Sequence, residues 1–258
     1  MRAAAPPAHR TGLPVRPVTR RACARVRGAA SAAHDSRGGD APAVLNLGLK
    51  EWAALVSAAS AGHITAFLRR GGVREAGFIV RSTAAVLIPT SHHQQGGDAA
   101  AAALTPALLA ATPPAVLAFD QRAADPLPLP AGAAFTAAWS IEGDGDEAAL
   151  TALFAALSPH TGLAPAGAAA RAAGAPALTL LELRVAALAP GPLLLPQATP
   201  GLWGCRSWVE LDGVAAVSLG PPALAEGGAW EEAQAGLRRA LAEASRGGGV
   251  RVTEVEFC

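Results

Sequence analysis

The sequence is poor in cysteine, lysine, methionine and tyrosine, and it has no long apolar run. Among its 258 residues are three cysteines, one methionine, no tyrosine and a single lysine, Lys50. Three cysteines exclude a small scaffold held together by disulfides. Glycine, proline and charged residues interrupt every apolar stretch before the roughly 18–20 residues that a membrane-spanning helix needs, so no such helix is predicted. The chain is 51% hydrophobic and long enough to bury a substantial core.

Acidic residues are absent from the first 34 positions, which carry seven arginines. From Asp35 onward there are 14 basic and 20 acidic residues, a net charge of −6. The basic segment is rich in Arg, Ala and Pro and has no apolar stretch of the secretory type. This composition favours an organelle transit peptide over a basic tail that stays attached, and a chloroplast over a mitochondrion. We expect residues 1–40 to be a disordered leader and linker.

Apolar spacing and turn residues predict a mixture of helices and strands over residues 46–258. Helices are expected over 48–61, 105–111, 147–157 and 230–244. Strands are expected over 63–70, 77–89, 133–142, 178–188, 202–211 and 250–257, with the first two as antiparallel neighbours. Because strands and helices do not alternate regularly, the pattern predicts one α+β domain with a mainly antiparallel sheet, packed helices and a disordered N-terminal leader.

Several local signals mark the ends of these elements. Thr105 and Asp146 are expected to cap helices, with Pro106 in the first helical position, and Gly62 is expected to end the helix over 48–61. The GDGD turn ending at Asp146 lacks the later ligands of a calcium loop, so a helix cap explains it better. Residues 125–132 are expected to form a loop, and the Ala-rich residues 162–176 a mobile low-complexity insertion.

No complete metal or catalytic set is visible in the sequence. The adjacent His92 and His93 have no third and fourth ligand at zinc spacing, and Cys205 has no partner in a Cys-x-x-Cys motif, so no metal site is predicted and the cofactor remains unknown. Trp203 and Trp208 flank Cys205 and Arg206. An aromatic ring beside an arginine can stack a base or another flat ligand, although packing of both tryptophans in the core is favoured.

Four short motifs follow one another in a recognisable order. They are LKEWA at 49–53, RGGV at 70–73, PT and HQ at 89–90 and 93–94, and SWVEL at 207–211. In this order they resemble the uncharacterised, largely bacterial family called domain of unknown function 1802, over about residues 46–245. The family pattern has a Glu where this chain has His92, so any role of that carboxylate is lost or remodelled here. The resemblance implies no mechanism.

Two hypotheses about function remain open. The first is a non-catalytic binding or accessory protein of the organelle, which recognises an anionic ligand, RNA or a stromal protein through arginines and hydrogen-bonding side chains. Its candidate binding residues are Arg69, Arg70, Arg74, Pro89, Thr90, His93, Gln94, Arg206, Ser207 and Trp208. The second is a nuclease-like enzyme that acts on a nucleotide or nucleic acid, with His93 as general acid or base and Glu51 or Glu210 as its carboxylate.

Overall fold

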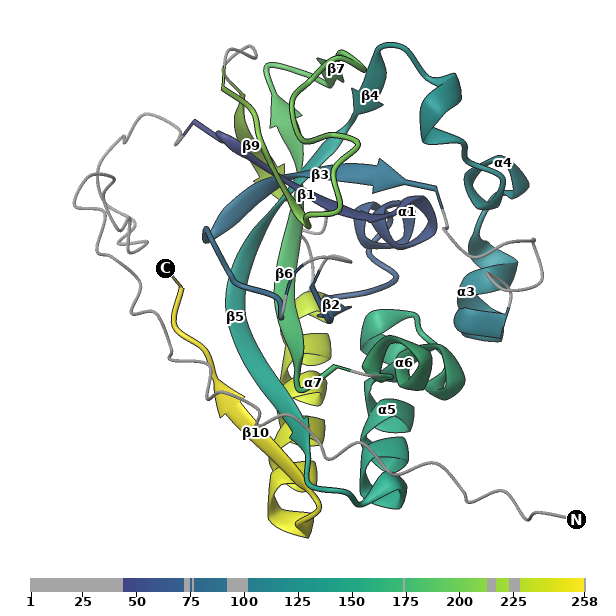
Figure 1. Ribbon diagram of the computed structural model, residues 1–258, viewed down its shortest axis with the longest axis vertical. Coiled ribbons are helices and arrows are strands. Elements are labelled where there is room, and N and C mark those ends of the chain that lie inside the picture. The colour runs from purple at the N-terminus through teal and green to yellow at the C-terminus, as the bar shows by residue number, and fades with distance from the viewer. Residues whose placement is uncertain are drawn as a thin grey trace, which may run out of the picture. The chain divides into compact units, whose positions relative to one another are not determined.

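The central sheet pairs strands that lie far apart in the sequence (Figure 1). The computed structural model describes residues 44–71, 75, 77–91, 102–173, 175–212, 217–222 and 228–257. In this part of the chain the sheet runs β2-β6-β5-β3-β1-β8, with β10 paired to β5 and β9 to β6. Its strands are β1 (Leu47–Trp52), β2 (Ala66–Arg69), β3 (Ala84–Thr90), β5 (Ala131–Gly143), β6 (Leu178–Ala189), β8 (Trp208–Glu210), β9 (Ser218–Pro222) and β10 (Val250–Glu254).

Only β1 and β3 pair in parallel; the other described pairs are antiparallel. A second, two-stranded sheet joins β4 (Leu127–Leu129) to β7 (Leu193–Leu195). The helical elements are α1 (Ala53–Ser60), α3 (Pro106–Ala111), α4 (Pro114–Leu117), the 3₁₀ helix η1 (Gln121–Ala123), α5 (Glu147–Thr161), α6 (Pro165–Ala172) and α7 (Ala229–Gly247). The expected α+β domain with a mostly antiparallel sheet is confirmed.

Two apolar cores lie against the sheet. The main core combines strand side chains such as Leu49 and Leu87 with α1, α5, α6 and α7. The smaller core contains Val86, Ile88 and Val209 together with the buried leucines of β4 and β7. Because successive side chains of a strand point to opposite faces, β1 presents Leu49 and Glu51 to the main core and Lys50 to the smaller one.

Local capping signals correctly locate two helices. The Thr105 hydroxyl accepts a hydrogen bond from the Leu108 N–H, and Pro106 opens α3. The Asp146 carboxylate accepts from the Ala149 N–H at the start of α5. Gly62 follows α1 with φ 76°, a conformation that favours glycine, so the predicted helix end is confirmed.

The beginning of the predicted helix over 48–61 is wrong, because residues 47–52 form strand β1. Its apolar spacing fits a helix through Val56, but β1 lies between β3 and β8, and four of its six residues are buried. Burial on both faces of an internal strand outweighs the helical period, and the helix begins only at Ala53.

Other expectations about strands also need correction. β2 and β3 are not neighbours: β2 pairs with β6, and β3 lies between β1 and β5. The expected strands over 77–89 and 202–211 shrink to β3 and β8, and the expected loop over 125–132 contains β4. These differences arise because long-range pairing, which local patterns do not encode, decides where a strand forms.

Residues 162–176 are not the mobile insertion that their composition predicts. Residues 165–172 form α6, which packs beside α5 (Figure 1). Ala168 is 2% exposed within the main core. Residues 165–172 are therefore part of the packed body of the protein.

Candidate functional site

Strands β3, β1 and β8 bring together three of the motifs that carry the family resemblance. Within the pairing of β1 and β3, Glu51 lies opposite Pro89 and Trp52 opposite Thr90. The Thr90 hydroxyl donates a hydrogen bond of 3.1 Å to the Glu51 carbonyl. The Lys50 N–H donates at 2.9 Å to the carbonyl of Ser207, immediately before β8. Motifs separated by up to about 150 residues of sequence therefore form one structural unit.

Glu51 is the charged centre of this unit. Its carboxylate is 1% exposed and accepts hydrogen bonds from Arg69 at 2.5 Å, from Arg171 at 3.0 Å and from the Trp52 N–H at 2.9 Å. Burial by itself would raise the pKa of the Glu51 carboxyl. The charges of Arg171 and Arg69 and the hydrogen bonds from Arg171 and Trp52 outweigh burial and lower the pKa to about 2. Glu51 is therefore ionised near neutral pH.

Arg69, a predicted binding residue, is held inside this cluster. Its residue surface is 8% exposed, and its guanidinium lies 5.3 Å from the centre of the Phe78 ring as well as against Glu51. Arg171 comes from α6, and its guanidinium stacks 3.9 Å from the centre of the Trp52 ring. Sequence reasoning missed Arg171, because nothing in an Ala-rich segment indicates that its arginine reaches a strand 120 residues away.

Lys50 holds a loop on the other face of β1. We call residues 201–206 the recognition loop. The Lys50 ammonium donates to the carbonyls of Gly204 at 2.6 Å, Gly201 at 3.2 Å and Leu202 at 3.4 Å. Desolvation by burial lowers the pKa of Lys50, and the nearby Glu75 and Cys205 only partly offset it. The single lysine of the chain thus faces three carbonyl oxygens of one loop.

Ser207 and Trp208, both predicted binding residues, are buried behind the recognition loop. The Ser207 hydroxyl donates to the Glu75 carboxylate at 2.8 Å. The Trp208 indole N–H donates to the Ile79 carbonyl at 2.8 Å, and its ring stacks on Phe78 with a centroid distance of 5.7 Å. Trp208 is thus a core residue, and the expected platform built from both Trp203 and Trp208 does not form.

Trp203 differs from Trp208 because 46% of its surface is exposed. Its indole N–H donates to the Gln197 carbonyl at 3.1 Å, which fixes the ring at the surface. The guanidinium of the exposed Arg122, from η1, lies 5.5 Å from the centre of the Trp203 ring. An aromatic–arginine platform therefore exists, with Arg122 as its arginine, although 81 residues of sequence separate the two side chains.

The remaining predicted site residues are distributed as follows. Arg70 and Arg206 are exposed, and Arg70 donates to the Ala173 carbonyl at 3.4 Å. Pro89 and Thr90 are buried at the end of β3. Three further predicted residues, Arg74, His93 and Gln94, lie outside the described residues.

Neither carboxylate proposed for an enzyme is part of a metal cluster within the described residues. Glu51 is enclosed by its two arginines. Glu210 forms an exposed ion pair with Arg81 at 2.8 Å. The enzyme hypothesis requires His93 and a carboxylate to lie in one pocket. Because His93 lies outside the described residues, this proximity stays a prediction.

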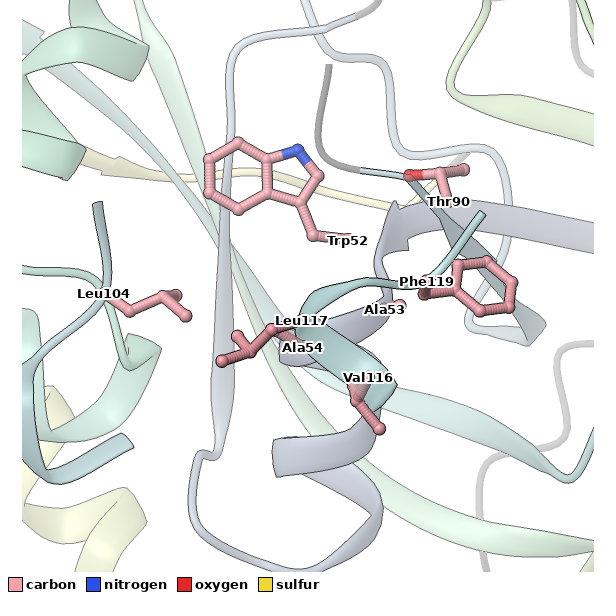
Figure 2. Close-up of a pocket in the computed structure, with 8 residues that line it drawn as sticks. All are labelled: Trp52, Ala53, Ala54, Thr90, Leu104, Val116, Leu117 and Phe119. Atoms are coloured by element: carbon pink, nitrogen blue, oxygen red, sulfur yellow. The ribbon is translucent and has the colours of Figure 1, made fainter. Parts of the chain in front are cut away.

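A narrow pocket opens where β1 and β3 end and α1 begins. Figure 2 shows Trp52 on one side and Val116 and Leu117 of α4 on another, with Thr90 near Phe119. The remaining lining residues are Ala53, Ala54 and Leu104. Its lining is almost entirely apolar and its volume is about 10 Å³, enough for about one water molecule. The pocket is therefore too small and too apolar to receive an organic anion.

The fold and these contacts define an α+β domain in which buried family-motif residues support an exposed loop carrying Trp203, Cys205 and Arg206. A sequence model of the domain of unknown function DUF1802 matches residues 48–232, so the chain belongs to this family. A search of curated proteins and a search of solved structures each found no match. Within the described residues, no helix is long and apolar enough to cross a membrane.

Proposed function

We propose that this protein is a non-catalytic binding protein for an anionic ligand with a flat ring, the chemistry shared by free nucleotides and single-stranded RNA. The observation that carries the proposal is the exposed Trp203 ring, fixed by its hydrogen bond to Gln197 and stacked beside Arg122. A base can stack on the indole, and Arg122 and Arg206 can face a phosphate.

The buried contacts around the recognition loop support this proposal. Lys50 and Ser207 fix the two ends of the segment that carries Trp203 and Arg206. A surface aromatic ring that is already ordered loses less conformational entropy when a ligand binds. Of the predicted binding residues that the structure describes, the exposed Arg206 and Arg70 are available to contact a ligand directly.

The charge of the chain limits how the ligand is recognised. The net charge of −6 from Asp35 onward disfavours broad, non-specific contact with nucleic acid. Two arginines at one platform correspond to about two phosphate contacts. For single-stranded RNA they predict a slope of roughly −1.4 in a plot of log affinity against log salt concentration.

The test is binding of a fluorescently labelled uridine octamer to the full chain, followed by competition with UMP. Trp203→Ala should weaken octamer binding about 5- to 150-fold, the range for loss of one stacked base. Trp203→Phe should retain most of the affinity, because a ring remains. Leu194→Ala is the matched control, since Leu194 is an exposed apolar residue of β7.

The two sources of the ligand give different results in this experiment. Competition by UMP at a concentration similar to that of the octamer indicates a nucleotide-binding protein, whereas a strong preference for the octamer indicates an RNA-binding protein. Equal octamer binding by wild type and Trp203→Ala would overturn the proposal. Hydrolysis of the octamer or UMP in the same samples would instead support the alternative, an enzyme that uses His93 as general acid or base.

We place this function in an organelle, with the chloroplast ahead of the mitochondrion, and include a stromal protein as an alternative partner. The support is the arginine-rich, acid-free composition of residues 1–34.

A further inference from the structure

Hydrogen bonds from Lys50 attach the recognition loop to the sheet. The Lys50 N–H donates to the Ser207 carbonyl, while its ammonium reaches the carbonyls of Gly201, Leu202 and Gly204. Lys50 therefore contacts the loop at its beginning, its middle and immediately after its end. Hydrogen bonds from a charged donor are about twice as strong as neutral ones, and the shortest of these measures 2.6 Å.

The loop has few other described attachments. One backbone bond within the loop joins the Gly204 N–H to the Gly201 carbonyl, and another joins the Leu202 N–H to the carbonyl of Thr199, just before the loop. The Trp203 indole is bonded to Gln197. Trp203, Gly204, Cys205 and Arg206 are all exposed. Leu202 alone is buried in the smaller core, at 2% exposure. Among the described contacts, Lys50 thus supplies three hydrogen bonds to the loop, beside the burial of Leu202, the bond of Trp203 to Gln197 and the bond of Ser207 to Glu75 just after the loop.

We infer that Lys50 is the positioning residue of the binding site: its ammonium clamps the recognition loop and thereby fixes Trp203 and Arg206 in the geometry that receives the ligand. The inference rests on the proposed function for its ligand, but the clamp itself can be tested without one. Lys50 is 9% exposed and its ammonium is occupied by carbonyls, so it acts through the loop and does not touch the ligand.

The single lysine allows a direct measurement on the wild-type chain. An amine-reactive reagent can modify only Lys50 and the N-terminal amine, which serves as the internal reference. Lys50 should react at least about tenfold more slowly than the N-terminal amine after correction for their pKa values, because it is buried and hydrogen-bonded. Reaction as fast as that of an exposed lysine would overturn the clamp.

The effect on the loop is tested with Lys50→Met, which keeps a similar length and removes the charge. Amide hydrogen exchange in residues 201–206 should accelerate about tenfold or more, while exchange in α7 stays unchanged. Octamer affinity should fall roughly tenfold, because the loop must be ordered again at each binding event. Unchanged exchange in the loop, or faster exchange with unchanged affinity, would overturn the inference.

A second variant separates this inference from the proposed function. Trp203→Ala should abolish most octamer binding and leave the slow modification of Lys50 unchanged, because the clamp uses backbone carbonyls. If Trp203→Ala binds the octamer normally, the proposed function is wrong. The clamp is then still tested by amide hydrogen exchange in residues 201–206 and by the rate of Lys50 modification. If Lys50→Met does not fold, the inference is tested on the wild-type chain alone. Lys50 modification should be slow there, and bound octamer should slow it further.

Discussion

At the scale of single residues, the carboxylate of Glu51 joins β1, β2 and α6. Glu51→Gln keeps the shape of the side chain but removes the charge that Arg69 and Arg171 face. Two buried guanidinium groups would then lack their counter-charge. We expect the free energy of unfolding to fall by about 3–5 kcal/mol, measured by urea denaturation near neutral pH. A loss below about 1 kcal/mol would contradict the assignment of Glu51 as the charged centre.

The same residue should make stability depend on acid. The pKa of the Glu51 carboxyl is about 2 in the folded protein, below its ordinary value of 4.5. The folded state therefore favours the ionised form, and the resulting stabilisation is present above pH 4.5 and is lost as the pH falls toward 2. In Glu51→Gln, the free energy of unfolding measured by urea denaturation should fall less steeply between pH 4.5 and pH 2. An unchanged slope would show that other carboxylates cause this pH dependence.

Trp203 and Trp208 show what a local pattern leaves undecided about a residue. Both lie in the same ten-residue stretch, beside the same Cys and Arg. Trp208 lies in β8 and is covered by Phe78 and Phe135, whereas Trp203 lies in the loop before β8. The sequence identifies an aromatic candidate here, but the choice between core and surface depends on strand pairing with β1.

At the scale of elements, α6 is attached to the sheet by Arg171. Its guanidinium contacts the Glu51 carboxylate, the Leu68 carbonyl and the Trp52 ring. Arg171→Ala should lower the free energy of unfolding by about 1–3 kcal/mol, less than Glu51→Gln, because Arg69 still pairs with Glu51. It should also increase hydrogen exchange in α6 more than in α7.

Arg70→Ala is the matched control for Arg171→Ala. Arg70 is exposed and, within the described residues, makes one long contact, to the Ala173 carbonyl in the segment just after α6. Its removal should change the free energy of unfolding by less than about 0.5 kcal/mol. Equal effects of the two substitutions in denaturation and exchange would show that the buried contacts of Arg171 do not hold α6.

Helix starts could be predicted from neighbouring residues, whereas strand pairing could not. Caps are local, so Thr105 and Asp146 predict the starts of α3 and α5 correctly. The apolar spacing of β1 continues into α1 and therefore predicts a helix, and only the position of β1 between β3 and β8 makes it a strand. Similarly, the fold class follows from the mixture of elements, while the pairing of β2 with β6 depends on long-range packing.

At the scale of the whole molecule, charge is distributed very unevenly along the chain. Residues 1–34 hold seven arginines and no acid, and the remaining chain has a net charge of −6. The proposed ligand-binding residues Trp203, Arg122 and Arg206 all belong to the acidic part. The proposed targeting function and the proposed binding function therefore use separate segments of the sequence, so we expect that each can be altered without disturbing the other.

This separation predicts the behaviour of the full chain fused at its C-terminus to a fluorescent protein in plant cells. The fusion should accumulate in chloroplasts, and replacing the seven leader arginines with glutamine should leave it outside them, because import sequences need a positively charged, acid-poor composition. Trp203→Ala should leave the location unchanged. Accumulation in mitochondria would select the alternative organelle. An unchanged location of the fusion after the arginine replacements would show that the arginines of residues 1–34 do not direct the protein to an organelle. This result would leave the proposed binding of the octamer by the recognition loop untouched.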